Sequence, residues 1–163
     1  MSPRVPIVVI GVGQSLRGDD AAGLEAVRLW QRTHAATAGL PGIRVALVEQ
    51  PGLELLAQLD GMDAAVLVDA AQLGLAAGGI QRIGVDKLAR VGRAAGSVHG
   101  WGVAEALQMD TLLNPKPGDR RIRIVGIEPH TWKVGTGLSA IVKRALPEAC
   151  RAIEEEVLGL LGS

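Results

Sequence analysis

A continuous aliphatic run near the start of the chain, residues 7–12, constrains the fold most strongly. The run is rich in β-branched residues, has no charged residue and ends among the glycines at positions 11 and 13. Such a pattern is typical of a central strand buried on both faces of a sheet, because a strand with one solvated face alternates apolar and polar residues. We therefore expect helices on both sides of this strand.

Further strand patterns alternate with helix patterns along the chain. Strands are predicted at residues 43–48, 63–69, 78–85 and 122–127, and helices at 20–36, 53–59, 101–113 and from 138 onward. Arg121 and Arg123 alternate outward around the last strand, which is typical of an edge strand. This order predicts an α/β fold, a three-layer sandwich with a twisted, mostly parallel sheet of about five strands and helices on both faces. No linker or repeat interrupts the pattern, so we expect a single domain over residues 1–163.

The composition excludes several classes of protein. The 17 basic and 17 acidic residues balance, and no basic stripe offers electrostatic support for nucleic-acid binding. The single cysteine, Cys150, excludes an intramolecular disulfide, and its place on the apolar stripe of the last helix predicts an inert core thiol. No apolar run is long enough to span a membrane and no signal-peptide pattern opens the chain, so we expect a cytoplasmic protein without membrane insertion.

Acidic residues follow two of the predicted strands. Asp19 and Asp20 come after the loop that ends the first strand, and Asp69 ends the wholly apolar strand at 63–69. Ligands of open α/β sheets bind beyond the carboxyl ends of the strands, so Asp20 and Asp69 meet at one edge if these two strands are neighbours. Each aspartate also has an ordinary interpretation: one of the pair at 19–20 serves as a helix cap, and Asp69 can anchor a turn.

His99 is a third candidate, although a histidine before a helix start is by itself more typical of a surface or capping residue. Two carboxylates and one imidazole suit a borderline divalent ion such as nickel or zinc, with positions left open for water or substrate. Asp20, Asp69 and His99 have no local spacing motif, so their residue types indicate a metal site without specifying one.

Other motifs are incomplete. Gly11 and Gly13 begin a dinucleotide-binding fingerprint, but the third glycine position holds Leu16. Ser15 misses the spacing of a nucleophile elbow by one residue. We predict no cofactor-binding residue, and a nucleotide-binding domain built on the loop 11–18 remains a weaker alternative.

Ordered blocks of the chain resemble the hydrogenase maturation endopeptidases of [NiFe] hydrogenases. In order, the blocks are GVGQSLRGDDAAG at 11–23, QPGLELL at 50–56, AVLVDA at 65–70, SVHG at 97–100, IVGIEP at 124–129 and GLS at 137–139. They span nearly the whole chain. Gln14 departs from the asparagine usual in the family, and the loop 74–96 also differs from its members.

The resemblance implies a metal-dependent endopeptidase that removes the C-terminal peptide of a hydrogenase large-subunit precursor after nickel insertion. The family's metal-contacting residues fall on Asp20, Asp69 and His99, which we also expect to be catalytic, with Asp19 as an accessory carboxylate. Nickel is expected to arrive with the precursor, and other divalent metals can take its place. Water is the expected nucleophile. The alternative is a non-enzymatic chaperone that senses the metal in the large subunit without cutting it.

Overall fold

The computed structural model describes residues 5–88, 102–114, 120–135 and 137–163. Its strands form one five-stranded sheet in the order β2-β1-β3-β5-β4. Their bounds are β1 Ile7–Val12, β2 Ile43–Val48, β3 Ala64–Ala70, β4 Ile80–Ile83 and β5 Arg121–Ile127. All pairs are parallel except β4 with β5, which is antiparallel. The predicted mostly parallel sheet of about five strands is confirmed.

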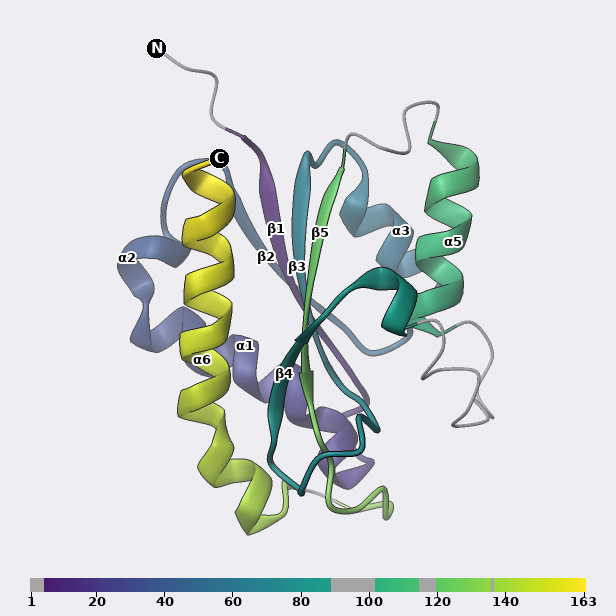
Figure 1. The fold of residues 1–163 in the computed structure, drawn as a ribbon, viewed down its shortest axis with the longest axis vertical. Coiled ribbons are helices and arrows are strands. Elements are labelled where there is room, and N and C mark those ends of the chain that lie inside the picture. Colours follow the sequence, from purple (N-terminus) through teal and green to yellow (C-terminus); the bar gives the residue numbers. More distant parts are fainter. Residues whose placement is uncertain (1–4, 89–101, 115–119, 136) are drawn as a thin grey trace.

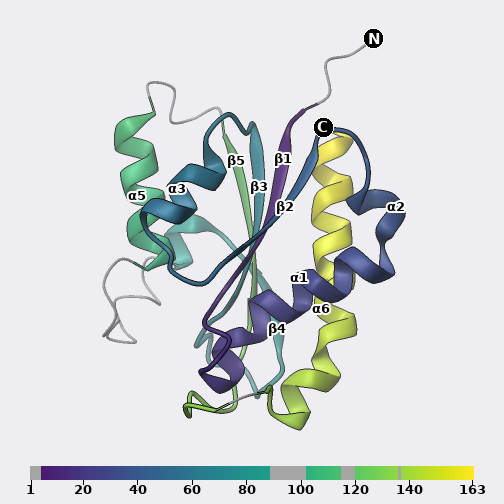
Figure 2. The same cartoon turned by 180° about the vertical axis from the view of Figure 1, so that it is seen from behind.

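Helices cover both faces of the sheet (Figures 1 and 2). Their bounds are η1 Gly18–Ala21, α1 Ala22–Thr33, α2 Ala35–Ala38, α3 Leu53–Leu59, α5 Val103–Leu113 and α6 Ala140–Leu161. The helices α1 and α6 lie against one face, and α3 and α5 lie against the other. The three-layer sandwich is therefore confirmed. No helix among the described residues is both long enough and apolar enough to span a membrane.

The strand β1 separates two cores, as its unbroken apolar run predicts. All its residues are buried, and alternate side chains pack on opposite faces: Ile7 and Val9 on the α1–α6 side, Val8 and Ile10 on the α3–α5 side. On the α1–α6 side, Trp30 is fully buried and its indole N–H donates a hydrogen bond to Glu154 at 2.8 Å. This bond gives the polar end of the indole a partner inside the core.

Two expectations about the elements are wrong. The strand β5 is interior, between β3 and β4, and β2 and β4 form the edges. Its arginines reach α6 instead of a solvated edge: Arg121 donates to the carbonyl of Leu160, and Arg123 pairs with Glu156 at 3.4 Å. The helix expected over residues 20–36 is divided into η1, α1 and α2, because the backbone at His34 leaves the helical region between α1 and α2.

Candidate functional site

The candidate aspartates lie at the carboxyl edge of the parallel strands, the lower end of the sheet in Figure 1. The strands β1 and β3 are neighbours, with Gly11 paired to Val68, so the condition for Asp20 and Asp69 to meet at one edge is fulfilled. Asp20 follows β1 through a loop and η1, and Asp69 is the penultimate residue of β3. The negative charge of Asp20 contributes to the raised pKa of Asp69, so the two carboxylates interact.

Two glycines allow α1 and its preceding loop to lie directly on the strand ends. A Cβ on Gly23 would come within 2.2 Å of the carbonyl oxygen of Val68 and 2.5 Å of that of Val12. At Gly13, where φ is +153°, a Cβ would lie 2.0 Å from the carbonyl oxygen of Asp20. These glycines therefore serve the close packing that holds Asp20 beside β3. Both glycines approach backbone atoms of the protein. In a dinucleotide-binding fold, the corresponding glycines let the backbone approach the pyrophosphate of the ligand.

Asp69 is the one acidic residue of an otherwise apolar strand. Burial in the protein raises its pKa well above the usual range, and the negative charge of Asp20 raises it further. The backbone N–H of Ala70 opposes this shift by donating a hydrogen bond. A carboxylate in such surroundings favours either a proton or a cation close by.

Asp20 is half-buried and has a backbone partner in its own loop. The N–H of Gln14 donates to Oδ2 of Asp20 at 2.9 Å. The residue that departs from the family pattern therefore contributes to this site through its backbone, which a glutamine and an asparagine supply equally well.

Asp19 points into a different part of the molecule. Its carboxylate is fully buried and accepts four hydrogen bonds: from the N–H groups of His130 (2.9 Å) and Thr131 (3.0 Å), and from the N–H and hydroxyl of Ser139 (both 2.7 Å). Burial would raise the pKa of Asp19, but these bonds outweigh it and lower the pKa below its usual value. Asp19 thus joins η1 to the loop after β5 and to the start of α6.

The expectation that Asp19 or Asp20 caps a helix is wrong. Neither η1 nor α1 has a side-chain hydrogen bond at its cap. The sequence did contain a signal for the role of Asp19, because one cap explains one aspartate and not two, and Ser139 belongs to a family block of its own.

A fourth carboxylate, which the sequence analysis did not single out, lies at the end of β2. Glu49 accepts hydrogen bonds from the hydroxyl of Ser15 and from its backbone N–H, the latter at 2.9 Å. The hydroxyl, and then the N–H, lower the pKa of Glu49. This contact connects the loop after β2 to the loop after β1, which leads to Asp20.

His99 lies outside the described residues, so its predicted place beside Asp20 and Asp69 stays a prediction. Within the ranges that the structure describes, no group of three or more histidine, cysteine, aspartate or glutamate side chains is arranged to hold a metal ion. Asp20 and Asp69 are oxygen donors at one edge of the sheet, and oxygen donors combine with imidazole in many sites for divalent ions. Cys150 is buried against α1, and burial is the main cause of its raised thiol pKa, as expected for an inert core thiol.

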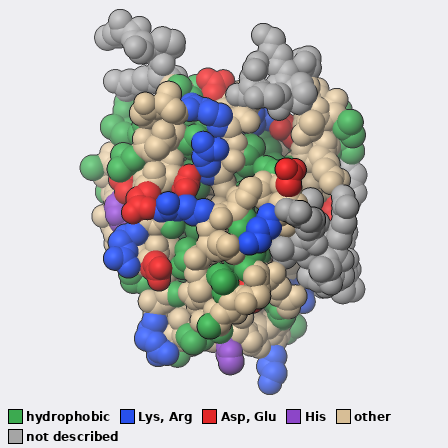
Figure 3. Space-filling view, viewed as in Figure 1, with side chains coloured by type: hydrophobic (Ala, Val, Ile, Leu, Met, Phe, Trp, Pro, Cys, Tyr) green, Lys and Arg blue, Asp and Glu red, His purple; other side chains and the backbone are tan. Residues whose placement is uncertain are grey.

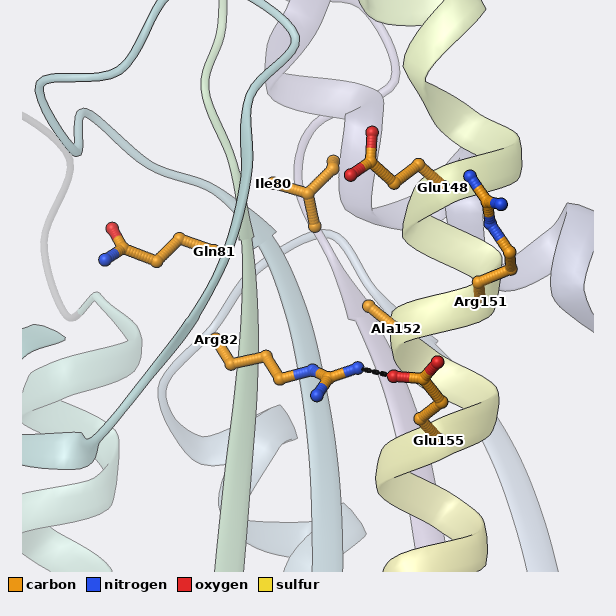
Figure 4. Close-up of a pocket in the computed structure, with 7 residues that line it drawn as sticks. All are labelled: Ile80, Gln81, Arg82, Glu148, Arg151, Ala152 and Glu155. Carbon is orange, nitrogen blue, oxygen red and sulfur yellow. Dashed lines mark hydrogen bonds and ion pairs between the residues drawn. The ribbon is translucent and has the colours of Figure 1, made fainter.

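A pocket lies between β4 and α6, and none of the candidate carboxylates lines it (Figure 4). It measures about 580 Å³, and Ile80, Gln81, Arg82, Glu148, Arg151, Ala152 and Glu155 line it. Arg82 forms an ion pair with Glu155 across the pocket. On the face shown in Figure 3, basic and acidic side chains are interspersed, as the balanced net charge leads one to expect.

A family model for hydrogenase maturation proteases matches residues 50–156, which is well over half of the chain. A curated relative, the hydrogenase expression/formation protein HupD of Thiocapsa roseopersicina, is 28% identical over 126 residues. That match covers 76% of this chain and 54% of the relative, so the chain spans about half the length of the relative.

Solved structures have the same fold. The hydrogenase maturating endopeptidase HybD of Escherichia coli aligns with a TM-score of 0.75 at 20% identity, over 91% of this chain and 90% of its own. The [NiFe] hydrogenase maturation protease HybD of Thermococcus kodakarensis aligns with a TM-score of 0.72 at 21% identity, over 94% and 99%. These similarities establish the architecture of the chain.

Proposed function

Because the chain belongs to the hydrogenase maturation protease family, we propose that it is an endopeptidase acting on the precursor of a [NiFe] hydrogenase large subunit. In this proposal it removes the C-terminal peptide of the precursor after nickel has been inserted. The names of its structural relatives, which describe a maturating endopeptidase and a [NiFe] hydrogenase maturation protease, support this reaction and this class of partner.

The observation that supports the proposal most is the pairing of Asp20 with Asp69 at the carboxyl edge of the sheet. Two interacting carboxylates, one of them with a strongly raised pKa, are stabilised in their charged forms by a nearby cation. A divalent ion held by a partner protein meets that requirement. We assign His99 to the same site as a nitrogen donor, on the family resemblance.

Nickel is the substrate's metal in this proposal. It is a borderline ion that accepts carboxylate oxygen and imidazole nitrogen, and other divalent ions accept the same donors. The pair Asp20 and Asp69 would contact the ion only when the precursor already holds it. The protein would thereby distinguish a finished precursor from one that still lacks nickel.

The cleavage itself would use water. Ser139 donates its hydroxyl to the buried Asp19, and Cys150 is buried, so neither is placed as a nucleophile. The water oxygen forms a bond to the scissile carbonyl carbon and gives its proton to a carboxylate. The bond from carbon to nitrogen then breaks, and the departing amine takes up the proton. We propose the cytoplasm as the place of this reaction.

The test is incubation of the protein with a nickel-loaded large-subunit precursor, with the precursor mass measured before and after. The mass should fall by that of the C-terminal peptide, and a nickel-free precursor should stay uncut. The variants Asp20→Ala, Asp69→Ala and His99→Ala should each lower the rate by about 100-fold or more, since each removes a group at the reacting centre. Asp60→Ala, at an exposed residue after α3, is the matched control and should cut normally.

Two results would contradict the proposal. Full activity of all three site variants would show that the site lies elsewhere. A stable complex with an unchanged precursor mass would indicate the non-enzymatic chaperone that senses the metal without cutting.

A further inference from the structure

A second pocket lies at the same edge of the sheet as the two carboxylates. It follows β2 directly, measures about 390 Å³ and has five consecutive residues as its lining: Gln50, Pro51, Gly52, Leu53 and Glu54. These residues begin the sequence block 50–56, which the carboxylate site does not use.

Its distance from the carboxylates follows from the strand order. The strand β2 lies next to β1, and β1 lies next to β3, so the ends of β2 and β3 are about 10 Å apart at the usual strand spacing. An extended peptide covers that distance in about three residues. The Ser15–Glu49 contact joins the two loops that lie along this path.

The pocket lining combines an exposed leucine and a proline with the exposed polar side chains of Gln50 and Glu54. Leu53 is 76% exposed in the first turn of α3, whereas Leu55 and Leu59 of the same helix are fully buried and hold the helix on the sheet. Pro51 adds a rigid apolar ring. Gly52 has φ +117° and ψ −125°, a conformation that side chains rarely adopt, so it fixes the turn that places Leu53. Packing of the core therefore does not explain Leu53.

We propose that this pocket is a subsite for an apolar side chain of the peptide segment that is cut, about three residues from the bond that breaks. An apolar side chain gains most from covering Leu53 and Pro51, because both then lose contact with water. This inference rests on the proposed peptidase function, and its position beside Asp20 and Asp69 is what selects a peptide substrate as the occupant.

The first experiment tests binding without cleavage. The ¹⁵N-labelled full chain is titrated with N-acetyl-leucinamide and, separately, with N-acetyl-argininamide, while the amide signals of Gly52, Leu53 and Glu54 are followed. Leucinamide should shift these signals saturably at millimolar concentration, and argininamide should not. No shift with leucinamide, or a larger shift with argininamide, would overturn the proposal.

The second experiment uses cleavage of the nickel-loaded precursor. Leu53→Ser should raise KM about tenfold and leave kcat within about twofold, because the contact is made before and during the reaction alike. Leu112→Ser is the matched control: Leu112 is also a helical leucine, 80% exposed, but it belongs to the last turn of α5 and does not line the pocket. Its KM should not change. Circular dichroism of both variants checks that they are folded.

The outcomes separate the two proposals. If the wild-type protein binds leucinamide at the pocket but cuts no precursor, the pocket does bind an apolar side chain and it is the peptidase function that fails. If the wild-type protein cuts but the KM of Leu53→Ser is unchanged, the peptidase function stands and the subsite is wrong.

Discussion

Asp19 and Asp69 lie at the same edge of the sheet, but the groups around their carboxylates differ. The Asp19 side chain has no exposed surface and accepts four hydrogen bonds from the loop after β5 and the start of α6. Asp69 is half-buried, and burial and the negative charge of Asp20 both act on its carboxyl group. Burial acts in the same direction on both residues, yet the pKa of Asp19 is lowered and that of Asp69 is raised.

The difference shows that hydrogen-bond donors, more than burial, decide what each carboxylate can do. Donors fixed by the fold stabilise the charged form of Asp19, so that residue is committed to holding loops together. The charge of Asp69 is opposed by burial and by the charge of Asp20, so its carboxyl group favours a proton or a nearby cation. Asp19 holds η1, the element that also contains Asp20, against the loop after β5 and the start of α6.

The largest effect is expected from Asp19→Ala. The change removes a charged acceptor from four buried donors and should lower the free energy of unfolding by about 3 kcal/mol at pH 7. Urea denaturation measures the loss. Because the pKa of Asp19 is lowered in the folded protein, its stabilisation is present above the ordinary value of 3.8 and is lost as the pH falls through the folded pKa. The difference in the free energy of unfolding between the wild-type protein and Asp19→Ala should therefore be smaller at low pH.

Ser139→Ala tests the same group of hydrogen bonds with a smaller change. It removes one of the donors to Asp19, the hydroxyl, and leaves the N–H of Ser139 in place. The loss should be about 1 kcal/mol. If Asp19→Ala is no less stable than Ser139→Ala, the four bonds do not support the fold as a group and the comparison with Asp69 fails.

Asp69→Asn should raise the free energy of unfolding, and by less than Asp19→Ala lowers it. The pKa of Asp69 is raised, so its contribution to stability is fully present below the unfolded value of 3.8 and is lost as the pH rises through the folded pKa. An asparagine carries no charge to be opposed. The variant should therefore match the wild-type protein near pH 4 and exceed it by about 1 kcal/mol or more at pH 8.

Thermal unfolding at pH 4, 6 and 8 measures this change. Asp60→Asn, at an exposed residue, is the control. It should not alter how the stability of the protein changes between pH 4 and pH 8. A loss of stability at pH 8 in Asp69→Asn would mean that the charged carboxylate is satisfied in the folded protein, and the contrast with Asp19 would then be wrong.

The sequence predicted the elements best where a local pattern defines them. The bounds of β2 at 43–48 and α3 at 53–59 match the prediction, because a mostly apolar run or a helical stripe lies between clear turn residues. The place of β5 inside the sheet was missed, since its arginines interact with α6, which follows much later in the chain. The antiparallel direction of β4 reflects the short connection at 71–79, which has no room for a crossover helix.

The candidate site was also predictable only where a general rule applies to the local sequence. Asp20 and Asp69 could be brought together from the rule for parallel strand ends once β1 and β3 were neighbours. The hydrogen bonds of Asp19 could not be predicted, because their donors lie 111 to 120 residues further along the chain. The adjacent aspartates at 19 and 20 indicate that one of them is not a cap, but they do not show which distant loop it binds.

The smallest effect is expected at Glu49, the fourth acidic residue described at this edge. It is exposed and accepts two hydrogen bonds from Ser15. Ser15→Ala removes the hydroxyl, the main cause of the lowered pKa of Glu49, and keeps the backbone N–H. The pKa of Glu49 should therefore rise toward its ordinary value of 4.5, while the free energy of unfolding changes by about 0.5 kcal/mol or less, as for an exposed contact. A ¹³C NMR titration of the Glu49 carboxyl measures the shift, and Ser163→Ala, at the far end of α6, should leave it unchanged. If the pKa of Glu49 stays where it is in Ser15→Ala, donors do not govern the exposed carboxylate, and the rule drawn from Asp19 and Asp69 applies only to buried ones.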